Sequence, residues 1–269
     1  MKPGIYYNLS FDEYLAIDAV NSSSLKNMIV SPRNYIRMKN LDKKTRSMDI
    51  GRIFHGMILE PGVSKIKCYD GIRRGKKWDS YKEENEGDTI IIASEKRSTD
   101  EMRESFYENA DAQKWIDLDN GDAEITIIFI EQLTGILCKA RIDFLDKACR
   151  FFTDLKTAKD VDTHGFQRQF TSLHYYFQFA FYQMALNSVF GLWPDAKCVV
   201  VQNGEPFDTV CYNVSPLALT EGKKLVLECL EKLKECKESN TWPGICNETI
   251  ELDLAAWAIE EPEIEGSTE

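Results

Sequence analysis

Two aspartates and one lysine lie in successive apolar segments near the middle of the chain. Asp143 stands in residues 141–145, and Asp154 and Lys156 stand in residues 151–157. If both segments are β-strands, Asp154 and Lys156 share a face, because residues i and i+2 of a strand point the same way. Asp143 can reach the same point from the neighbouring strand. Two carboxylates with a backbone carbonyl form an oxygen-rich site that suits Mg²⁺ or Mn²⁺. A lysine beside such a site can orient a water molecule or stabilise phosphoryl charge.

An ion pair on a solvated strand face is the competing interpretation of this pattern. Taken alone, Asp-x-Lys is more often such a pair than part of an active site. Here Phe151, Phe152 and Leu155 surround it and indicate a buried strand, where unpaired charge is costly. This context favours the metal-binding interpretation.

The elements that must position these residues are strands followed by a long helix. Hydrophobic periodicity and turn residues predict strands over 123–131, 135–145 and 151–157, a helix over 174–190, strands over 197–203 and 207–214, and a helix over 215–238. Upstream they predict short helices over 11–17, 25–29 and 33–39, a helix over 48–59, a loop with a helical turn over 71–88, a strand over 89–93 and a helix over 94–109. The order predicts an α/β protein with a central mixed β-sheet flanked by helices and a helical N-terminal region.

The same segmentation predicts one domain and a tail. Residues 1–246 form the domain, with a helical, basic part over 1–62 and an α/β core over 89–238. Residues 247–269 carry eight acidic side chains and no basic one, and they are expected to be a partly disordered acidic tail.

The charge balance is acidic overall but uneven along the chain. A net charge of −11 argues, at face value, against a nucleic-acid partner. Residues 1–80, however, hold 15 basic and 8 acidic side chains. A local basic surface is therefore compatible with the acidic total.

The lack of a recognisable targeting signal and the spacing of the cysteines predict a cytoplasmic protein. The first residues lack the apolar segment of a secretory signal, and no stretch approaches the roughly 20 apolar residues of a membrane span. None of the eight cysteines forms a Cys-x-x-Cys pair, which disfavours zinc and iron–sulfur sites. Reduced, buried thiols are the expectation.

Longer motifs around these residues resemble a known enzyme family. Asp143, followed by Asp154 to Thr157, resembles the metal-binding core of the PD-(D/E)XK nuclease superfamily. Gln178 and Tyr182 resemble the Gln-x-x-x-Tyr motif of its RecB-like branch, and as i and i+4 of one helix they share a face.

Two upstream segments narrow the resemblance to the RecE-type (exonuclease VIII) nuclease domain. Residues 51–61 are similar to its Gly-x-x-x-His…Leu-Glu-Pro helix, and residues 123–124 and 134–143 also fit. The motifs occur in order between about residue 5 and residue 243. The resemblance implies the PD-(D/E)XK nuclease core.

The family implies a role for the central residues. Asp143, Asp154 and the Leu155 carbonyl are implied as metal ligands. Lys156 is implied to position or activate the attacking water, and His55 to be an additional ligand. The implied cofactor is Mg²⁺ or Mn²⁺, with two ions in each active site.

The sequence allows two interpretations for each of three further residues, Glu124, Gln178 and Tyr182. Glu124 is a candidate acid for the second metal or for the water, with an ordinary surface carboxylate as an equal alternative. Gln178 and Tyr182 are expected to shape the site or to contact the substrate, although an aromatic helix would otherwise be assigned to the core.

The implied activity is 5′→3′ digestion of one strand of linear double-stranded DNA, which leaves a 3′ overhang. The family further implies a toroidal homo-oligomer, a trimer or tetramer, and a RecT-type single-strand annealing protein as partner, in a bacterial or phage-encoded system. The alternatives are a RecB-like endonuclease, a repair nuclease or a catalytically silent DNA-end binder. Unclustered cysteines argue against an iron–sulfur repair nuclease, and the intact set of Asp143, Asp154 and Lys156 argues against the silent binder.

The basic residues of the first 80 positions are the candidate DNA contacts. A helix N-terminus can bind phosphate, and the predicted DNA-binding residues there are Ser23, Ser24 and Lys26. The remaining candidates, which are expected to line a DNA channel or to grip a strand, are Arg33, Arg37, Arg73, Arg74, Lys76 and Lys77.

Overall fold

The structure is a computed structural model that describes residues 1–39, 46–63 and 66–254. The acidic residues 255–269 and the basic residues Lys43 and Lys44 lie outside this range. Residues 247–254, the start of the expected tail, are exposed and contain neither helix nor strand.

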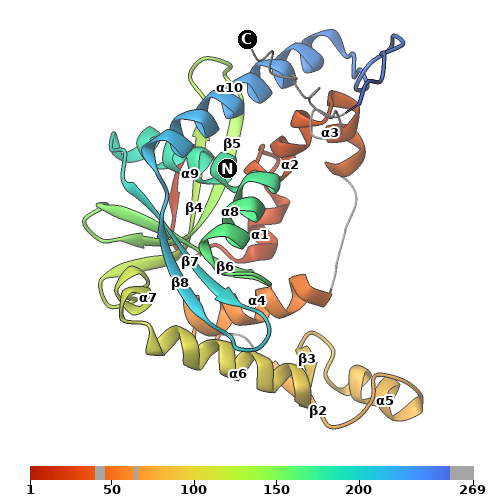
Figure 1. The fold of residues 1–269 in the computed structure, drawn as a ribbon, viewed down its shortest axis with the longest axis vertical. Coiled ribbons are helices and arrows are strands. Elements are labelled where there is room, and N and C mark those ends of the chain that lie inside the picture. Colours follow the sequence, from red (N-terminus) through yellow and green to blue (C-terminus); the bar gives the residue numbers. More distant parts are fainter. Residues whose placement is uncertain (40–45, 64–65, 255–269) are drawn as a thin grey trace, which may run out of the picture.

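A six-stranded mixed sheet forms the centre of the molecule (Figure 1). In spatial order its strands are β1 (Gly4–Tyr6), β4 (Gly121–Ile130), β5 (Leu137–Asp146), β6 (Phe151–Ala158), β7 (Asp195–Gln202) and β8 (Thr209–Asn213). Only β6 and β7 run parallel, and the other neighbours are antiparallel. The predicted α/β class with a central mixed sheet flanked by helices is confirmed. The short edge strand β1 was not predicted.

Helices cover both faces of this sheet. On one face α8 (Thr163–Ser172), α9 (Tyr175–Phe190) and α10 (Pro216–Ser239) pack into the larger hydrophobic cluster. On the other face α4 (Arg46–Leu59), α6 (Ala93–Glu108) and α7 (Ala110–Trp115) pack into a smaller cluster. Burial of apolar side chains on both sides is the main stabilising contribution to such a layered fold.

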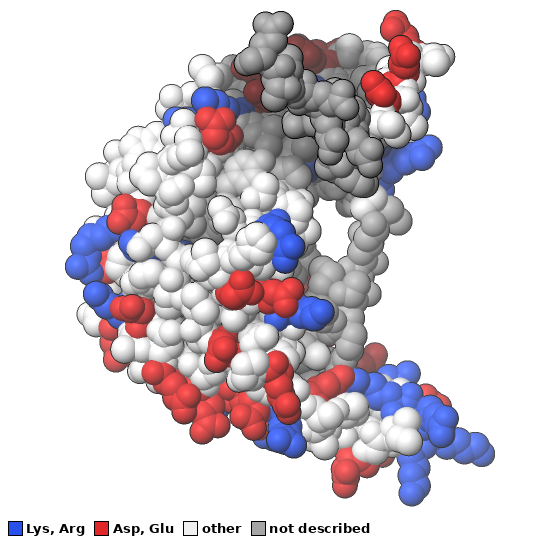
Figure 2. Space-filling model, viewed as in Figure 1, with Lys and Arg blue, Asp and Glu red and all other residues white. Residues whose placement is uncertain are grey.

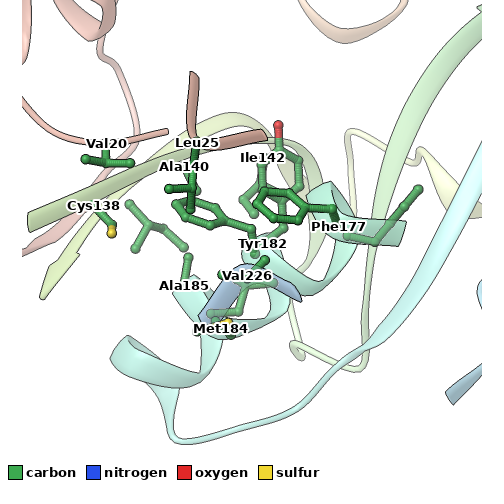
Figure 3. Packing of buried hydrophobic residues seen from close by; sticks show 14 of the residues in the cluster. Val20, Leu25, Cys138, Ala140, Ile142, Phe177, Tyr182, Met184, Ala185 and Val226 are labelled. Atoms are coloured by element: carbon green, nitrogen blue, oxygen red, sulfur yellow. The ribbon is translucent and has the colours of Figure 1, made fainter. Parts of the chain in front are cut away.

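The larger cluster joins the N-terminal region to the sheet (Figure 3). Leu25 from the N-terminal region belongs to the same cluster as Ala140 and Ile142 of β5, Phe177 of α9 and Val226 of α10. These side chains are almost completely buried. The N-terminal helices are therefore part of the same core as the α/β layers.

The N-terminal region consists of short elements, as predicted. They are α1 (Phe11–Ala16), α2 (Ser22–Leu25), the 3₁₀ helix η1 (Lys26–Ile29) and α3 (Pro32–Lys39). Ser10 caps α1 in a capping box with Glu13. Val20 bridges to β5 through hydrogen bonds with Leu137 and Lys139.

Close packing places α4 directly against β6. A Cβ atom on Gly51 would lie 3.1 Å from the Thr157 hydroxyl, a contact tighter than side chains normally make. Glycine at this position therefore lets the helix approach the strand that carries Asp154 and Lys156.

A small projecting arm, defined as residues 66–92, extends from the body beside the start of α6 (Figure 1). It consists of β2 (Ile66–Tyr69), α5 (Lys76–Glu84) and β3 (Thr89–Ile92), with β2 and β3 paired in parallel. The expectation of a loop with one helical turn over 71–88 was wrong, because residues 76–84 form a nine-residue helix. That helix buries none of its residues, so its sequence lacks the apolar stripe that would have identified it.

Two helices, α7 and α8, were also missed. Both begin with a side-chain cap, from Asn109 and Asp162 respectively. With six residues, α7 is too short for hydrophobic periodicity to reveal. In α8 the i, i+4 spacing of Phe166 and Phe170 was an available signal. No helix in the described part of the chain is long and apolar enough to cross a membrane.

Candidate active site

The site lies where β5 and β6 separate. These strands pair at Phe144 with Thr153 and at Leu145 with Phe152, next to their shared turn. Beyond that point the Asp143 carboxylate accepts the Leu155 N–H at 2.8 Å, in the place of a backbone carbonyl. The separation of the strands therefore exposes the Leu155 backbone to the space around Asp143.

An irregularity in β4 and β5 faces the same space. Cys138, Ala140 and Ile142 pack into the larger cluster, but Phe144 packs into the smaller one on the opposite face. The pairing of β4 with β5 is interrupted at one position, where Glu124 and Asp143 would otherwise face each other. Glu124 has a φ of 53°, which is unusual for a residue other than glycine.

Asp154 and Lys156 point to one face, as their spacing predicted. The Lys156 ammonium forms an ion pair with Asp154 and lies 5.0 Å from the centre of the Tyr175 ring. Burial disfavours the charged form of Lys156, but Asp154 and Asp143 outweigh it and raise the pKa of this lysine. Lys156 is therefore a cation held beside two carboxyl groups.

Gln178 connects this pair to α9. Its side-chain amide donates to Asp154 at 3.1 Å and to the Tyr182 hydroxyl at 2.8 Å, and its oxygen accepts from Lys156 at 3.2 Å. Tyr182 is buried in the larger cluster. The motif Gln-x-x-x-Tyr thus fixes the orientation of Asp154 and Lys156 from the helix that covers them.

His55 reaches the site from α4. Its Nδ1 lies 3.7 Å from an Asp143 oxygen. Burial, together with the nearby Lys156 charge, lowers the pKa of His55 to about 4 although a hydrogen bond to the Leu155 backbone opposes this. The imidazole is therefore neutral near pH 7, which is the form that binds metal ions.

The donors around Asp143 fit a divalent cation. Ligand atoms of His55, Glu124 and Asp143 all lie within 4.8 Å of one another. Asp154 is not one of these three, but its charge acts on Asp143 and Glu124. Its buried Oδ2 faces the Lys156 ammonium and has no regular hydrogen bond within the described structure. Carboxylate oxygens with one imidazole suit Mg²⁺, Mn²⁺ or a related ion.

The electrostatics of these carboxyl groups agree with that fit. Burial, followed by the charges of Asp154 and Glu124, raises the pKa of Asp143 well above its ordinary value. Burial also raises the pKa values of Asp154 and Glu124, although Lys156 and Arg141 respectively oppose it. A cation would offset this crowded negative charge.

The structure brings together all the residues predicted for the active centre. They come from α4, three adjacent strands and α9, and they are His55, Glu124, Asp143, Asp154, Leu155, Lys156, Gln178 and Tyr182. Leu155 contributes its backbone, while its side chain lies in the smaller cluster. Sequence reasoning assigned no role to Arg141, which pairs with Glu124. Its role could have been suspected from the sequence, because Arg141 lies two residues before Asp143 on the same strand.

The predicted phosphate site at residues 22–26 is less open than expected. Helix α2 has only four residues, and the Asn21 side chain already accepts the Ser24 N–H at 2.8 Å. Ser23 is exposed, whereas the Lys26 ammonium donates to the Leu173 carbonyl at 2.9 Å. Burial, assisted by the charge of Lys156, lowers the pKa of Lys26. Lys26 is therefore the member of this group that lies towards the active centre.

The remaining basic candidates occupy two separate places. Arg33 and Arg37 are exposed on α3, and the others belong to the arm, which lies away from α3 in Figure 1. Arg73 joins the arm to the start of α6, because its guanidinium donates to Glu95 of α6 at 2.5 and 2.7 Å and to the Ile90 carbonyl of β3 at 3.0 Å. Its structural role there differs from the strand-gripping role expected for it.

Three basic side chains of the arm are exposed to solvent. Arg74, Lys76 and Lys77 have no ion-pair partner in the part of the chain that the structure describes. Figure 2 shows the Lys and Arg side chains gathered over the arm, at the lower right of the view. The local basic surface that the charge distribution allowed is therefore present.

Comparisons with known proteins agree with this geometry. The model of a PDDEXK-like domain of unknown function (DUF3799) matches residues 21–252. No curated protein matches the chain. The fold is similar to the crystal structure of a protein from Eubacterium rectale that is provisionally named an exonuclease, with a TM-score of 0.64 and 13% identity over 92% of this chain and 96% of that one.

A second crystal structure, of a phage-related exonuclease from Haemophilus somnus 129PT, is more distant. It is 13% identical over 85% of this chain and 99% of that one, but its TM-score of 0.36 is too low to show a common fold. The family match covers residues 21–252, a range that includes β5, β6 and the buried site between them. The chain belongs to the PDDEXK-like DUF3799 family.

Proposed function

We propose that the protein is a metal-dependent nuclease that hydrolyses the phosphodiester bonds of DNA. The observation that carries this proposal is the cluster of Asp143, Asp154 and Lys156 at the separated strands, with Glu124 and His55 completing the donor set. Family membership supports a nuclease of this superfamily.

The chain's own residues divide the work of hydrolysis between them. A bound divalent metal, Mg²⁺ or Mn²⁺ and two ions by family resemblance, supplies Lewis acidity and activates water. His55, Glu124, Asp143 and Asp154 would hold it. Lys156 orients the attacking water or stabilises charge on the phosphate.

The finer proposal is an exonuclease that digests one strand of linear duplex DNA 5′→3′ and leaves a 3′ overhang. Support comes from the RecE-type motifs in the sequence and from the exonuclease name carried by the structural relative from Eubacterium rectale. In this proposal the active enzyme is a toroidal trimer or tetramer, and a RecT-type annealing protein receives the overhang.

The arm supplies the backbone contacts in this proposal. Arg74, Lys76 and Lys77 are exposed and clustered, and in the sequence the arm follows α4, the helix that carries His55. Such side chains attract phosphates without reading sequence. Ser23, Ser24, Lys26, Arg33 and Arg37 are the further candidate contacts.

Linear duplexes labelled at either the 5′ or the 3′ end test the proposal. With Mg²⁺, we expect loss of the 5′-ended strand and persistence of the 3′-ended strand, with no digestion in EDTA. The Asp154→Asn variant should be inactive. The matched control is Asp146→Asn, which alters a buried β5 carboxylate that pairs with Arg150 at 2.6 Å outside the site.

Three other results would contradict the proposal, and each has its own interpretation. Cutting of closed circular DNA would indicate a RecB-like endonuclease or a repair nuclease. Binding to DNA ends without cleavage under any metal condition would indicate a catalytically silent end binder. Equal loss of activity in Asp154→Asn and Asp146→Asn would mean that the effect is damage to the fold.

A further inference from the structure

Arg141 is a buried cation directly beside the metal-binding group. It lies on β5, two residues before Asp143, and is only 8% exposed. Its Nε forms an ion pair with Glu124. Burying a charged side chain is costly unless it is fully paired. The partners of Arg141 therefore indicate its role.

The other end of the guanidinium holds the N-terminal segment. One terminal nitrogen donates to the Leu9 carbonyl at 2.7 Å and lies 3.4 Å from the Thr126 hydroxyl. The Tyr14 ring lies 6.0 Å from the guanidinium carbon. Arg141 therefore connects residues just before and within α1 to Glu124.

Glu124 needs such a partner because its backbone conformation is unfavourable. A φ of 53° inside a strand is strained for a residue other than glycine and persists only where surrounding contacts enforce it. That conformation belongs to the residue whose carboxylate lies with His55 and Asp143. The ion pair with Arg141 is the contact that fixes the carboxylate there.

Lys139 is a natural internal comparison on the same strand. It is also buried, and its ammonium donates to the carbonyls of Tyr14, Leu15 and Ile17 at 2.7, 3.2 and 2.8 Å. It secures the N-terminal segment, whereas Arg141 contacts both that segment and Glu124. A planar guanidinium with several donors can hold the segment and the carboxylate together, whereas an ammonium acts as a single point of charge.

We infer that Arg141 is a positioning residue that orients Glu124 towards the metal-binding group, and that the segment around Leu9 and Tyr14 supports the active site from outside through it. This inference rests on the proposed function, since it requires the group to bind a divalent metal. Partners that orient a ligand typically change metal affinity by about 10- to 100-fold.

Calorimetric titration of the full chain with Mn²⁺, without DNA, tests the inference. Arg141→Met should weaken Mn²⁺ binding about 10- to 100-fold, and Arg141→Lys should cause a smaller loss. The Lys139→Met control should weaken Mn²⁺ binding less than Arg141→Met does, because Lys139 secures the N-terminal segment whereas Arg141 also pairs with Glu124. Far-ultraviolet circular dichroism in EDTA checks that each variant is folded.

A double-mutant cycle separates a role through Glu124 from a general structural role. If Arg141 acts through Glu124, the double variant Arg141→Met/Glu124→Gln should bind Mn²⁺ no more weakly than Glu124→Gln alone. Additive losses, unchanged or tighter binding in Arg141→Met, or an equal loss in Lys139→Met would overturn the inference. If the wild type binds no Mn²⁺, the proposed function fails as well, so the two failures are distinguishable.

Discussion

Charged side chains are used in opposite ways in the active site and in the arm. In the site, Asp143, Asp154 and Lys156 are enclosed by strands and α9, and their pKa values are displaced from the ordinary range. In the arm, Arg74 and Lys76 are exposed, and α5 buries none of its residues. Buried charges interact strongly with each other, whereas exposed charges are screened by water and salt.

This contrast determines what each region can contribute to function. A buried, fixed cluster can stabilise charge that develops during a reaction, because its groups are already oriented. An exposed set of cations can attract a polyanion but cannot distinguish a reacting atom. We therefore expect changes in the site to alter the rate of cleavage, and changes in the arm to alter binding and its salt dependence.

The largest effect is expected for Lys156→Met. Loss of the cation beside the reacting phosphate should lower the single-turnover cleavage rate about 1,000-fold. Lys197→Met is a matched control, because Lys197 lies on the neighbouring strand with a side chain of almost equal exposure, 16% against 15%. It contacts Trp115 of α7 on the opposite face of the sheet. Comparable rates for the two variants would contradict a catalytic role for Lys156.

A smaller effect is expected for the residues that orient this lysine. Gln178→Leu removes the hydrogen bonds to Asp154, Lys156 and Tyr182, and it should lower the cleavage rate about 100-fold through misplacement. Tyr182→Phe removes only the acceptor of one Gln178 hydrogen bond and should cost less. Single-turnover kinetics at saturating metal measures both. A larger loss in Tyr182→Phe than in Gln178→Leu would reverse the assigned order.

Changes in the arm should leave the chemical step intact. Combined substitution of Arg74, Lys76 and Lys77 by serine should weaken duplex binding and reduce the slope of log affinity against log salt by up to about 0.9 for each phosphate that the protein no longer neutralises. Fluorescence anisotropy over a salt series measures this. The control replaces Lys232, Lys234 and Lys237 of α10, which lies away from the arm in Figure 1. An equal decrease in the control would show that the arm holds no particular phosphate.

The smallest effect concerns stability without metal. Asp143→Asn should raise the melting temperature in EDTA by about 2–4 °C, corresponding to roughly 1 kcal/mol, because it removes a buried charge next to Asp154 and Glu124. The folded-state pKa of Asp143 is raised above its ordinary value, so the wild type loses stability as pH rises through that interval. The stabilisation by Asn should therefore grow with pH. Thermal melts at several pH values check this, and a lower melting temperature at every pH would contradict it.

Much of the core could be predicted from the sequence because periodicity reports burial directly. The strands around Asp143 and Asp154 and the apolar helix containing Gln178 and Tyr182 carry strong patterns. Spacing alone also placed Asp154 with Lys156 and Gln178 with Tyr182. Local sequence is sufficient for contacts within a single strand or helix.

Contacts that depend on irregular backbone could not be predicted in this way. The positive φ of Glu124 and the separation of β5 from β6 are set by tertiary packing and leave no periodic signal. The link from Leu9 through Arg141 to Glu124 spans distant parts of the chain for the same reason. The full length of helix α5 was not predicted, because its sequence is polar on every face and resembles that of a loop.

Anomalous diffraction from crystals soaked in Mn²⁺ tests the proposed metal site without relying on activity, because it locates the ion itself. We expect a peak at the group formed by His55, Glu124 and Asp143, adjacent to the buried Oδ2 of Asp154. Crystals of Asp143→Asn should lose or weaken that peak. Mn²⁺ bound elsewhere, or an empty group in crystals of protein that cleaves DNA with Mn²⁺, would contradict the proposed metal site.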